Sequence, residues 1–201
     1  MTGQSFKGRK IYFKVNDGVY SPAMDSYLIL DVLKLKSSDT FLEIGCGVGM
    51  ATALASTIVK RAVAVDISYE AVRNTLETLQ RNNCTANTSI VQSDLLNAFH
   101  DSIRFSVIVF NPPYLPADEY ETSMDHAFVG GETGTEVSER YIKQACKLIE
   151  GDGSIYVIVS SLSDPEHVIE VMKEQGLDVQ SVGHRTFFME RVDLLRGTLT
   201  T

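Results

Sequence analysis

The stretch "TFLEIGCGVGM", residues 40–50, decides the fold. Its first half is a short apolar run typical of a buried strand, and Gly45, Gly47 and Gly49 follow directly. A helix-forming run, residues 50–57, comes next. Glycine permits a tight turn and lets a ligand lie against bare backbone, while the N-terminus of the following helix offers unpaired N–H groups. Strand, glycine loop and helix in this order predict the ligand-binding unit of an α/β fold.

The rest of the chain repeats this alternation of strand-like and helix-like segments. Strands are predicted at 40–45, 61–66, 88–94, 105–111 and 153–161 and twice within 177–197, and helices at 21–35, 50–57, 69–82, 136–150 and 165–176. This pattern predicts a Rossmann-like α/β fold with a seven-stranded, mostly parallel sheet and helices on both faces. We expect a single domain over residues 1–201, with an N-terminal extension at 1–36 that carries a substrate-side helix and a core at 37–201. Val15 and Val19 suggest an added edge strand.

Length, charge and cysteine content narrow the function. The chain has 201 residues, a formal charge of -8 and a pI of about 5.0, so nucleic acid and anionic membranes are unfavourable partners. Cys46, Cys84 and Cys146 are widely spaced, and without a C-x-x-C pair we expect no metal site. Scattered thiols suit a reducing compartment, and no apolar run reaches the ~18 residues of a membrane span. The expectation is a cytoplasmic protein.

Three acidic residues stand at or near the ends of successive predicted strands: Glu43, Asp66 and Asp94. Open α/β sheets bind ligands at the carboxyl ends of their strands, so these side chains are expected in one site. S-adenosyl-L-methionine suits such a site, because its sulfonium and amino group are cationic and it carries no phosphate. The alternative is that the glycine turn is an ordinary feature of a doubly wound fold and that the carboxylates are merely solvated.

The fourth predicted strand runs into "VFNPPYLP", residues 109–116. The two prolines make the backbone rigid where the strand stops. Asn111 offers a side-chain carbonyl oxygen, and the Pro112 carbonyl can point the same way. Two acceptors suit a group with two N–H donors, an amide or amine NH₂, and Tyr114 supplies a flat face for it. The alternative is a proline-rich loop that only ends the strand.

These residues resemble a known family. The run Asn111 to Tyr114, with "EIGCGVG" (43–49), "VYSPAMDS" (19–26) and "GGETG" (130–134), is similar to the HemK family of glutamine N5-methyltransferases. The resemblance implies a class I S-adenosyl-L-methionine-dependent methyltransferase that modifies the Gln of the Gly-Gly-Gln loop in class I translation release factors. Only about twenty residues precede Val19, so the chain resembles the short archaeal and eukaryotic branch, whose members work with a small zinc-binding activator subunit.

The resemblance also implies roles for individual residues. Catalytic roles fall on Asn111, Pro112 and Tyr114; cofactor contacts on Ser26, Glu43, Gly45, Gly47, Asp66, Ile67, Asp94, Leu95 and Asn111; and substrate contacts on Tyr20, Pro22, Asn111, Pro112, Pro113 and Tyr114. The sequence departs from the branch at Met24, where an acid often precedes the position of Asp25. The role of that extra carboxylate is therefore not carried over.

Other functions stay open on the sequence. The Asn-Pro-Pro-Tyr run also occurs in methyltransferases that act on amino groups of RNA or DNA bases, and a protein lysine offers similar N–H donors. A binding module with the fold but no chemistry is a third possibility. Met50 disfavours a dehydrogenase, because the dinucleotide fingerprint needs glycine there. The acids Asp118, Glu119, Glu121 and Asp125 either attract a basic substrate loop or form a solvated face. The segment with Gly130, Gly131 and Gly134 is either a substrate-gripping lid or a disordered excursion.

Overall fold

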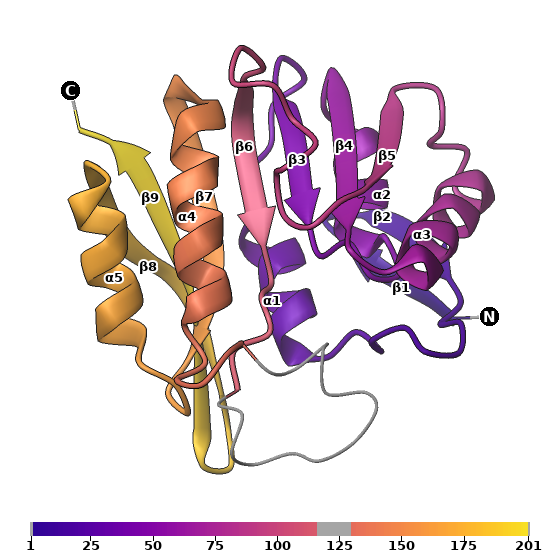
Figure 1. Cartoon of the computed structure of the whole chain (residues 1–201). Coiled ribbons are helices and arrows are strands. Elements are labelled where there is room, and N and C mark those ends of the chain that lie inside the picture. Colours follow the sequence, from indigo (N-terminus) through magenta and orange to yellow (C-terminus); the bar gives the residue numbers. More distant parts are fainter. Residues whose placement is uncertain (1, 116–129, 201) are drawn as a thin grey trace.

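The computed structural model describes residues 2–115 and 130–200, which form a central sheet between two helical layers (Figure 1). The sheet contains β3 (Thr40–Ile44), β4 (Arg61–Asp66), β5 (Thr88–Gln92), β6 (Phe105–Phe110), β7 (Ile149–Ser160), β8 (Leu177–Phe187) and β9 (Glu190–Leu199). The helices are α1 (Met24–Val32), α2 (Met50–Ser56), α3 (Tyr69–Arg81), α4 (Glu136–Leu148) and α5 (Pro165–Glu174). The predicted seven-stranded α/β fold is confirmed.

The strand order is β5-β4-β3-β6-β7-β9-β8, with β9 antiparallel to both of its neighbours and the other pairs parallel. The chain moves outward from β3 to β4 and β5, then returns to place β6 on the other side of β3. This reversal between β3 and β6 is the point where open α/β sheets bind ligands. Ile44 is in register with Val65 on β4 and Phe110 on β6, so Gly45, Asp66 and Asn111 emerge together at one edge.

Alternating side chains of the sheet feed two cores. On one face, Phe41 packs in the cluster that includes α1 and α2, and on the other, Leu42 and Ile44 pack in the cluster that includes α4. Tyr141 of α4 is fully buried and packs edge-on against Phe110, the last residue of β6. Burial on both faces explains why the central strands read as nearly continuous apolar runs.

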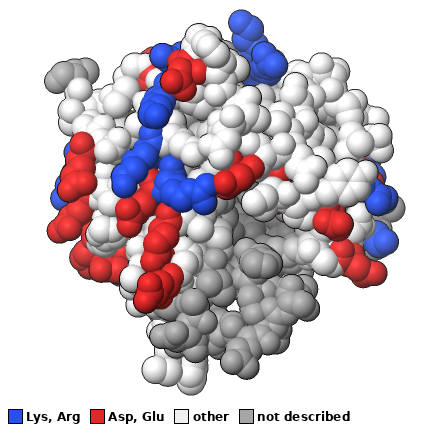
Figure 2. Space-filling model, viewed as in Figure 1, with Lys and Arg blue, Asp and Glu red and all other residues white. Residues whose placement is uncertain are grey.

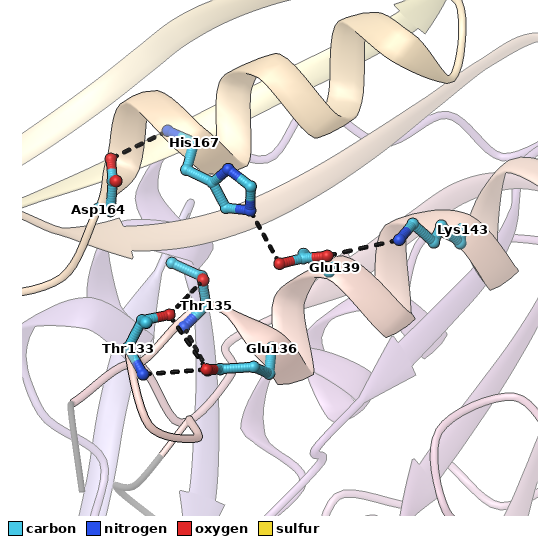
Figure 3. A network of polar contacts seen from close by, with 7 residues as sticks. All are labelled: Thr133, Thr135, Glu136, Glu139, Lys143, Asp164 and His167. Carbon is cyan, nitrogen blue, oxygen red and sulfur yellow. Dashed lines mark hydrogen bonds and ion pairs between the residues drawn. The ribbon is translucent and has the colours of Figure 1, made fainter.

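Polar contacts fix the start of α4 and tie it to α5 (Figure 3). The Glu136 carboxylate accepts from the backbone N–H groups of Thr133 and Thr135, at 3.0 and 3.1 Å. One turn later, Glu139 lies 2.8 Å from His167 Nε2 on α5, and this hydrogen bond raises the pKa of His167. The first turn of α4, which reaches the site described below, is therefore held in place.

The N-terminal region differs from the prediction. Residues 2–13 form a hairpin of β1 (Thr2–Phe6) and β2 (Arg9–Phe13), separate from the main sheet. The hairpin and the residues after it attach to α3 and its C-cap. Asn74 Nδ2 donates to the Lys14 carbonyl at 2.8 Å. Asn82 accepts from the Tyr12 N–H through Oδ1 and donates to the Tyr12 carbonyl through Nδ2. The expected edge strand at Val15 and Val19 is wrong, because those residues lie outside the strands.

Two further features bear on partners. No helix within residues 2–115 and 130–200 is both long and apolar enough to cross a membrane. Figure 2 shows charged side chains of both signs gathered over α4 and α5, whereas the part of this face over β4 and β5 carries few. The edge strand β5 therefore lies beside a weakly charged surface.

Candidate active site

A cavity of about 1100 Å³ opens at the carboxyl ends of β3, β4 and β6. The predicted site residues all line it, namely Tyr20, Pro22, Ser26, Glu43, Gly45, Gly47, Asp66, Ile67, Asp94, Leu95, Asn111, Pro112, Pro113 and Tyr114. Parallel strands bring residues from distant parts of the chain to one edge. The structure thus gathers these residues in one place, while their individual roles remain predictions.

The glycine loop shapes one wall of the cavity. Gly45 has a φ of 65°, and a side chain there would press on the Phe110 ring at 3.0 Å. Asp66 is held by the N–H groups of Gly47 and Ser68, each at 3.0 Å to a different carboxylate oxygen. Burial raises the pKa of Asp66, and these two donors act against that rise. The loop therefore fixes the carboxylate at the end of β4.

Glu43 supports the loop from within the sheet. Its Oε2 accepts from the backbone N–H of Thr52 at 2.8 Å and also from the Thr52 hydroxyl, in the first turn of α2. Burial raises the pKa of Glu43 to about 7, although the Thr52 donors oppose the shift. These contacts show Glu43 joining the end of β3 to the first turn of α2 and so ordering the loop between them.

Asp94 makes an ion pair that the sequence did not reveal. Arg140 Nη2 lies 2.5 Å from Asp94 Oδ2, and Arg140 lines the cavity from α4. Leu95, the next residue, has a φ of 47°, an uncommon conformation for a side chain of its size. Arg140 stands in an ordinary amphipathic helix, so no local pattern marked it. Pairing with Arg140 fixes the Asp94 carboxylate at the rim.

The other end of the cavity centres on Asp25, which is only 4% exposed. Its Oδ2 lies 3.0 Å from Asn111 Nδ2, 3.2 Å from the Tyr20 hydroxyl and 3.4 Å from the Tyr114 hydroxyl. Its Oδ1 accepts from the backbone N–H of Ser26 at 2.6 Å. No local pattern marks Asp25 as a site residue, because an acid in the first turn of a helix is usual for electrostatic reasons alone.

Asp25 determines which way the Asn111 amide faces. With Nδ2 donating to Asp25, the Asn111 Oδ1 atom points elsewhere, and it is buried without a hydrogen-bond partner among the described residues. An unpaired buried acceptor costs on the order of 1–3 kcal/mol. Burial, then the Asp25 charge, raises the pKa of both Tyr20 and Tyr114, so both phenols stay protonated as donors. Asn111 Oδ1 is therefore the acceptor of this group that is left unpaired among the described residues.

Gly130 supports the segment of residues 111–114, which we call the corner. The Gly130 N–H donates to the Leu115 carbonyl at 2.9 Å. A side chain on Gly130 would collide with the carbonyl oxygens of Pro113 and Gly134. Gly130 therefore packs against the corner. The acidic cluster at Asp118, Glu119, Glu121 and Asp125 lies outside the described residues, so its role stays a prediction.

The chain is similar to known methyltransferases. The methyltransferase small domain family matches residues 10–186. A Methanocaldococcus jannaschii relative named "Putative protein N5-glutamine methyltransferase" is 36% identical, covering 85% of this chain and 86% of its own length, and the HEMK2 methyltransferase of Mus musculus is 33% identical over 89% and 88%. The solved E. cuniculi Mtq2–Trm112 complex, described as methylating the eRF1 termination factor, shares the fold: TM-score 0.73, 24% identity, 91% of this chain and 99% of that one.

Proposed function

Because the chain belongs to the methyltransferase small domain family, we propose that it is a protein-glutamine N5-methyltransferase that uses S-adenosyl-L-methionine and modifies the Gly-Gly-Gln loop of a class I release factor. The relatives that share most of its length support this acceptor. We further propose that it acts in the cytoplasm, where release factors work.

One observation carries the choice of acceptor: Asn111 lines the cavity, and its Oδ1 is buried without a hydrogen-bond partner among the described residues. A primary amide of glutamine donates two hydrogen bonds from one nitrogen, which matches this oxygen and the neighbouring Pro112 carbonyl. Asp25 prevents the Asn111 amide from turning its NH₂ group toward the substrate. The site therefore selects a donor group and rejects an acceptor.

The donor set also fits the proposed cofactor. Asp66, fixed by two backbone donors, suits a ribose diol, and Gly47 has open space where a side chain would stand, so a ligand can approach its backbone. The other residues that would hold it also line the cavity, namely Ser26, Glu43, Gly45, Ile67, Asp94, Leu95 and Asn111. When bound, the cofactor supplies an electrophilic methyl group on a positively charged sulfur.

The residues of the corner perform the remaining work. An amide nitrogen is a weak nucleophile because its lone pair is delocalised, so orientation and exclusion of water must supply most of the rate. Asn111 and Pro112 would hold both N–H hydrogens and turn the lone pair toward the methyl carbon. The nitrogen becomes acidic as it is alkylated, so no strong base is needed beforehand. Tyr114, anchored by Asp25, would cover the planar amide.

A partner subunit is the second part of the proposal. The Mtq2 chain of similar fold was solved with Trm112, and the present chain has an edge strand, β5, beside a weakly charged surface. A zinc-binding activator of that kind would cover this edge. A soluble and fully active lone chain would count against the subunit, without affecting the chemistry.

The experiment is a methylation assay on a purified class I release factor, with and without a Trm112-type subunit. Peptide mass spectrometry would locate the added methyl. We expect one methyl on the Gln of Gly-Gly-Gln. Methylation of lysine instead, or strongly salt-dependent methylation of RNA or DNA with an unmodified release factor, would overturn the proposed acceptor.

A further inference from the structure

The turn between β8 and β9 carries two exposed apolar side chains. Phe188 is 93% exposed and Met189 is 81% exposed, more than any other large apolar residue of the described chain. Leu162, which follows β7, is also partly exposed. Scattered apolar residues are ordinary on a protein surface, but adjacent ones at the end of a hairpin need an explanation.

Folding does not explain them. Phe187 pairs with Glu190, so Phe188 and Met189 form a two-residue turn, and Phe188 adopts a φ of 49°. That conformation strains a bulky side chain, and hairpin turns of this length favour glycine or asparagine there. Phe188 is therefore unfavourable in this turn, and its side chain gains little packing in return. This indicates that the side chain serves a contact with another molecule.

The turn lies on the acceptor side of the site. β8 runs parallel to β6 and β7, so its carboxyl end reaches the same edge of the sheet as Asn111 (Figure 1). At the base of the turn, Glu190 accepts from Ser160 at the end of β7, at 2.7 Å. Burial and Asp25 raise the pKa of Tyr20 and Tyr114 most, and the Glu190 charge also contributes to this rise. By contrast, β4, which carries Asp66, and β5, which precedes Asp94, lie on the side of β3 opposite to β6.

We propose that Phe188 and Met189 form a docking tip that contacts an apolar patch on a folded protein substrate, beside the residue being methylated. This inference rests on the proposed function, because it concerns how the same site receives its acceptor. A protein substrate is the occupant that fits, since the tip flanks the acceptor end of the cavity rather than the cofactor end. A short acceptor peptide would fill the cavity without reaching the tip.

The test compares two substrates and two variants, with a Trm112-type subunit present throughout. Phe188→Gly with Met189→Ser removes the apolar surface and supplies residues that favour a two-residue turn, so the hairpin should keep its stability. Ile103→Ser is the matched control, because Ile103 is 41% exposed and precedes β6 at the other edge of the sheet. Each protein is assayed on an intact release factor and on a synthetic Gly-Gly-Gln peptide.

We expect the double variant to raise KM for the intact release factor by roughly tenfold, with kcat and the peptide kinetics unchanged. The control should match the unsubstituted protein on both substrates. Unchanged KM for the intact factor would overturn the docking tip, and so would an equal loss on both substrates or a loss of Trm112-type subunit binding in a pull-down. If the unsubstituted protein methylates neither substrate, the proposed function itself fails.

Discussion

The amide nitrogen of Asn111 donates to the Asp25 carboxylate at 3.0 Å, although 86 positions of sequence separate the two residues. This contact joins the first turn of α1 to the end of β6. It leaves the Asn111 carbonyl oxygen buried without a hydrogen-bond partner among the described residues. The proposed chemistry depends on that orientation.

Asn111→Ala should remove methyl transfer while leaving cofactor affinity largely unchanged. The variant loses the acceptor that orients the amide, a change expected to lower kcat by about 10²–10³-fold, as removal of a positioned polar group does elsewhere. Single-turnover assays would measure the transfer, and calorimetry would measure cofactor binding. A rate near that of the unsubstituted protein would show that Asn111 does not orient the substrate.

Asp25→Asn tests the carboxylate behind Asn111. The new amide oxygen would stay with the Ser26 N–H, at 2.6 Å in the unsubstituted protein, so its NH₂ group would face Asn111 Nδ2. Two donors cannot pair, and the displaced corner should lower kcat by roughly 10²-fold. Asp31→Asn is the control, since Asp31 is an exposed acid of the same helix, paired with Arg185. Equal kcat for the two variants would refute the role of Asp25.

Gly130→Ala should distort the corner from behind. The added methyl group collides with the carbonyl oxygens of Pro113 and Gly134, so we expect a loss of roughly 1–3 kcal/mol in unfolding free energy and a lower kcat. Gly151→Ala is the control, because Gly151 has no atom of the described residues within 4 Å of the added group. Denaturant melts and kinetics would be compared. Normal values for both variants would mean that the corner does not rely on Gly130.

Glu43 should make stability depend on pH. Its pKa is about 7 in the folded protein against 4.5 for an ordinary glutamate, so the folded state binds the proton more tightly between these values. Stability contributed by this group is therefore lost as pH rises through that window. Glu43→Gln removes the titration, so the melting temperature of the variant should gain on that of the unsubstituted protein from about pH 5 to about pH 8. A difference that stays constant over this range would contradict the assignment.

Local patterns were sufficient for much of this molecule. The strand, glycine loop and helix at residues 40–57 predicted the fold because backbone geometry and burial act over a few residues, and the structure confirms it. Acids near strand ends predicted the edge where the cavity lies. The hairpin at residues 2–13 was missed because β1 is mostly polar, although its two-residue turn of Lys7 and Gly8, both with positive φ, is a local hairpin signal.

What the sequence determined by itself is the set of groups available: a glycine turn, carboxylates at strand ends and a rigid asparagine corner. The tertiary structure alone decided which groups meet. Asp25 and Arg140 look like ordinary residues of helices, and they reach the cavity only because α1 and α4 pack near the carboxyl edge of the sheet. Hydrogen bonds and ion pairs act over a few ångströms of space, and sequence separation carries no information about that distance.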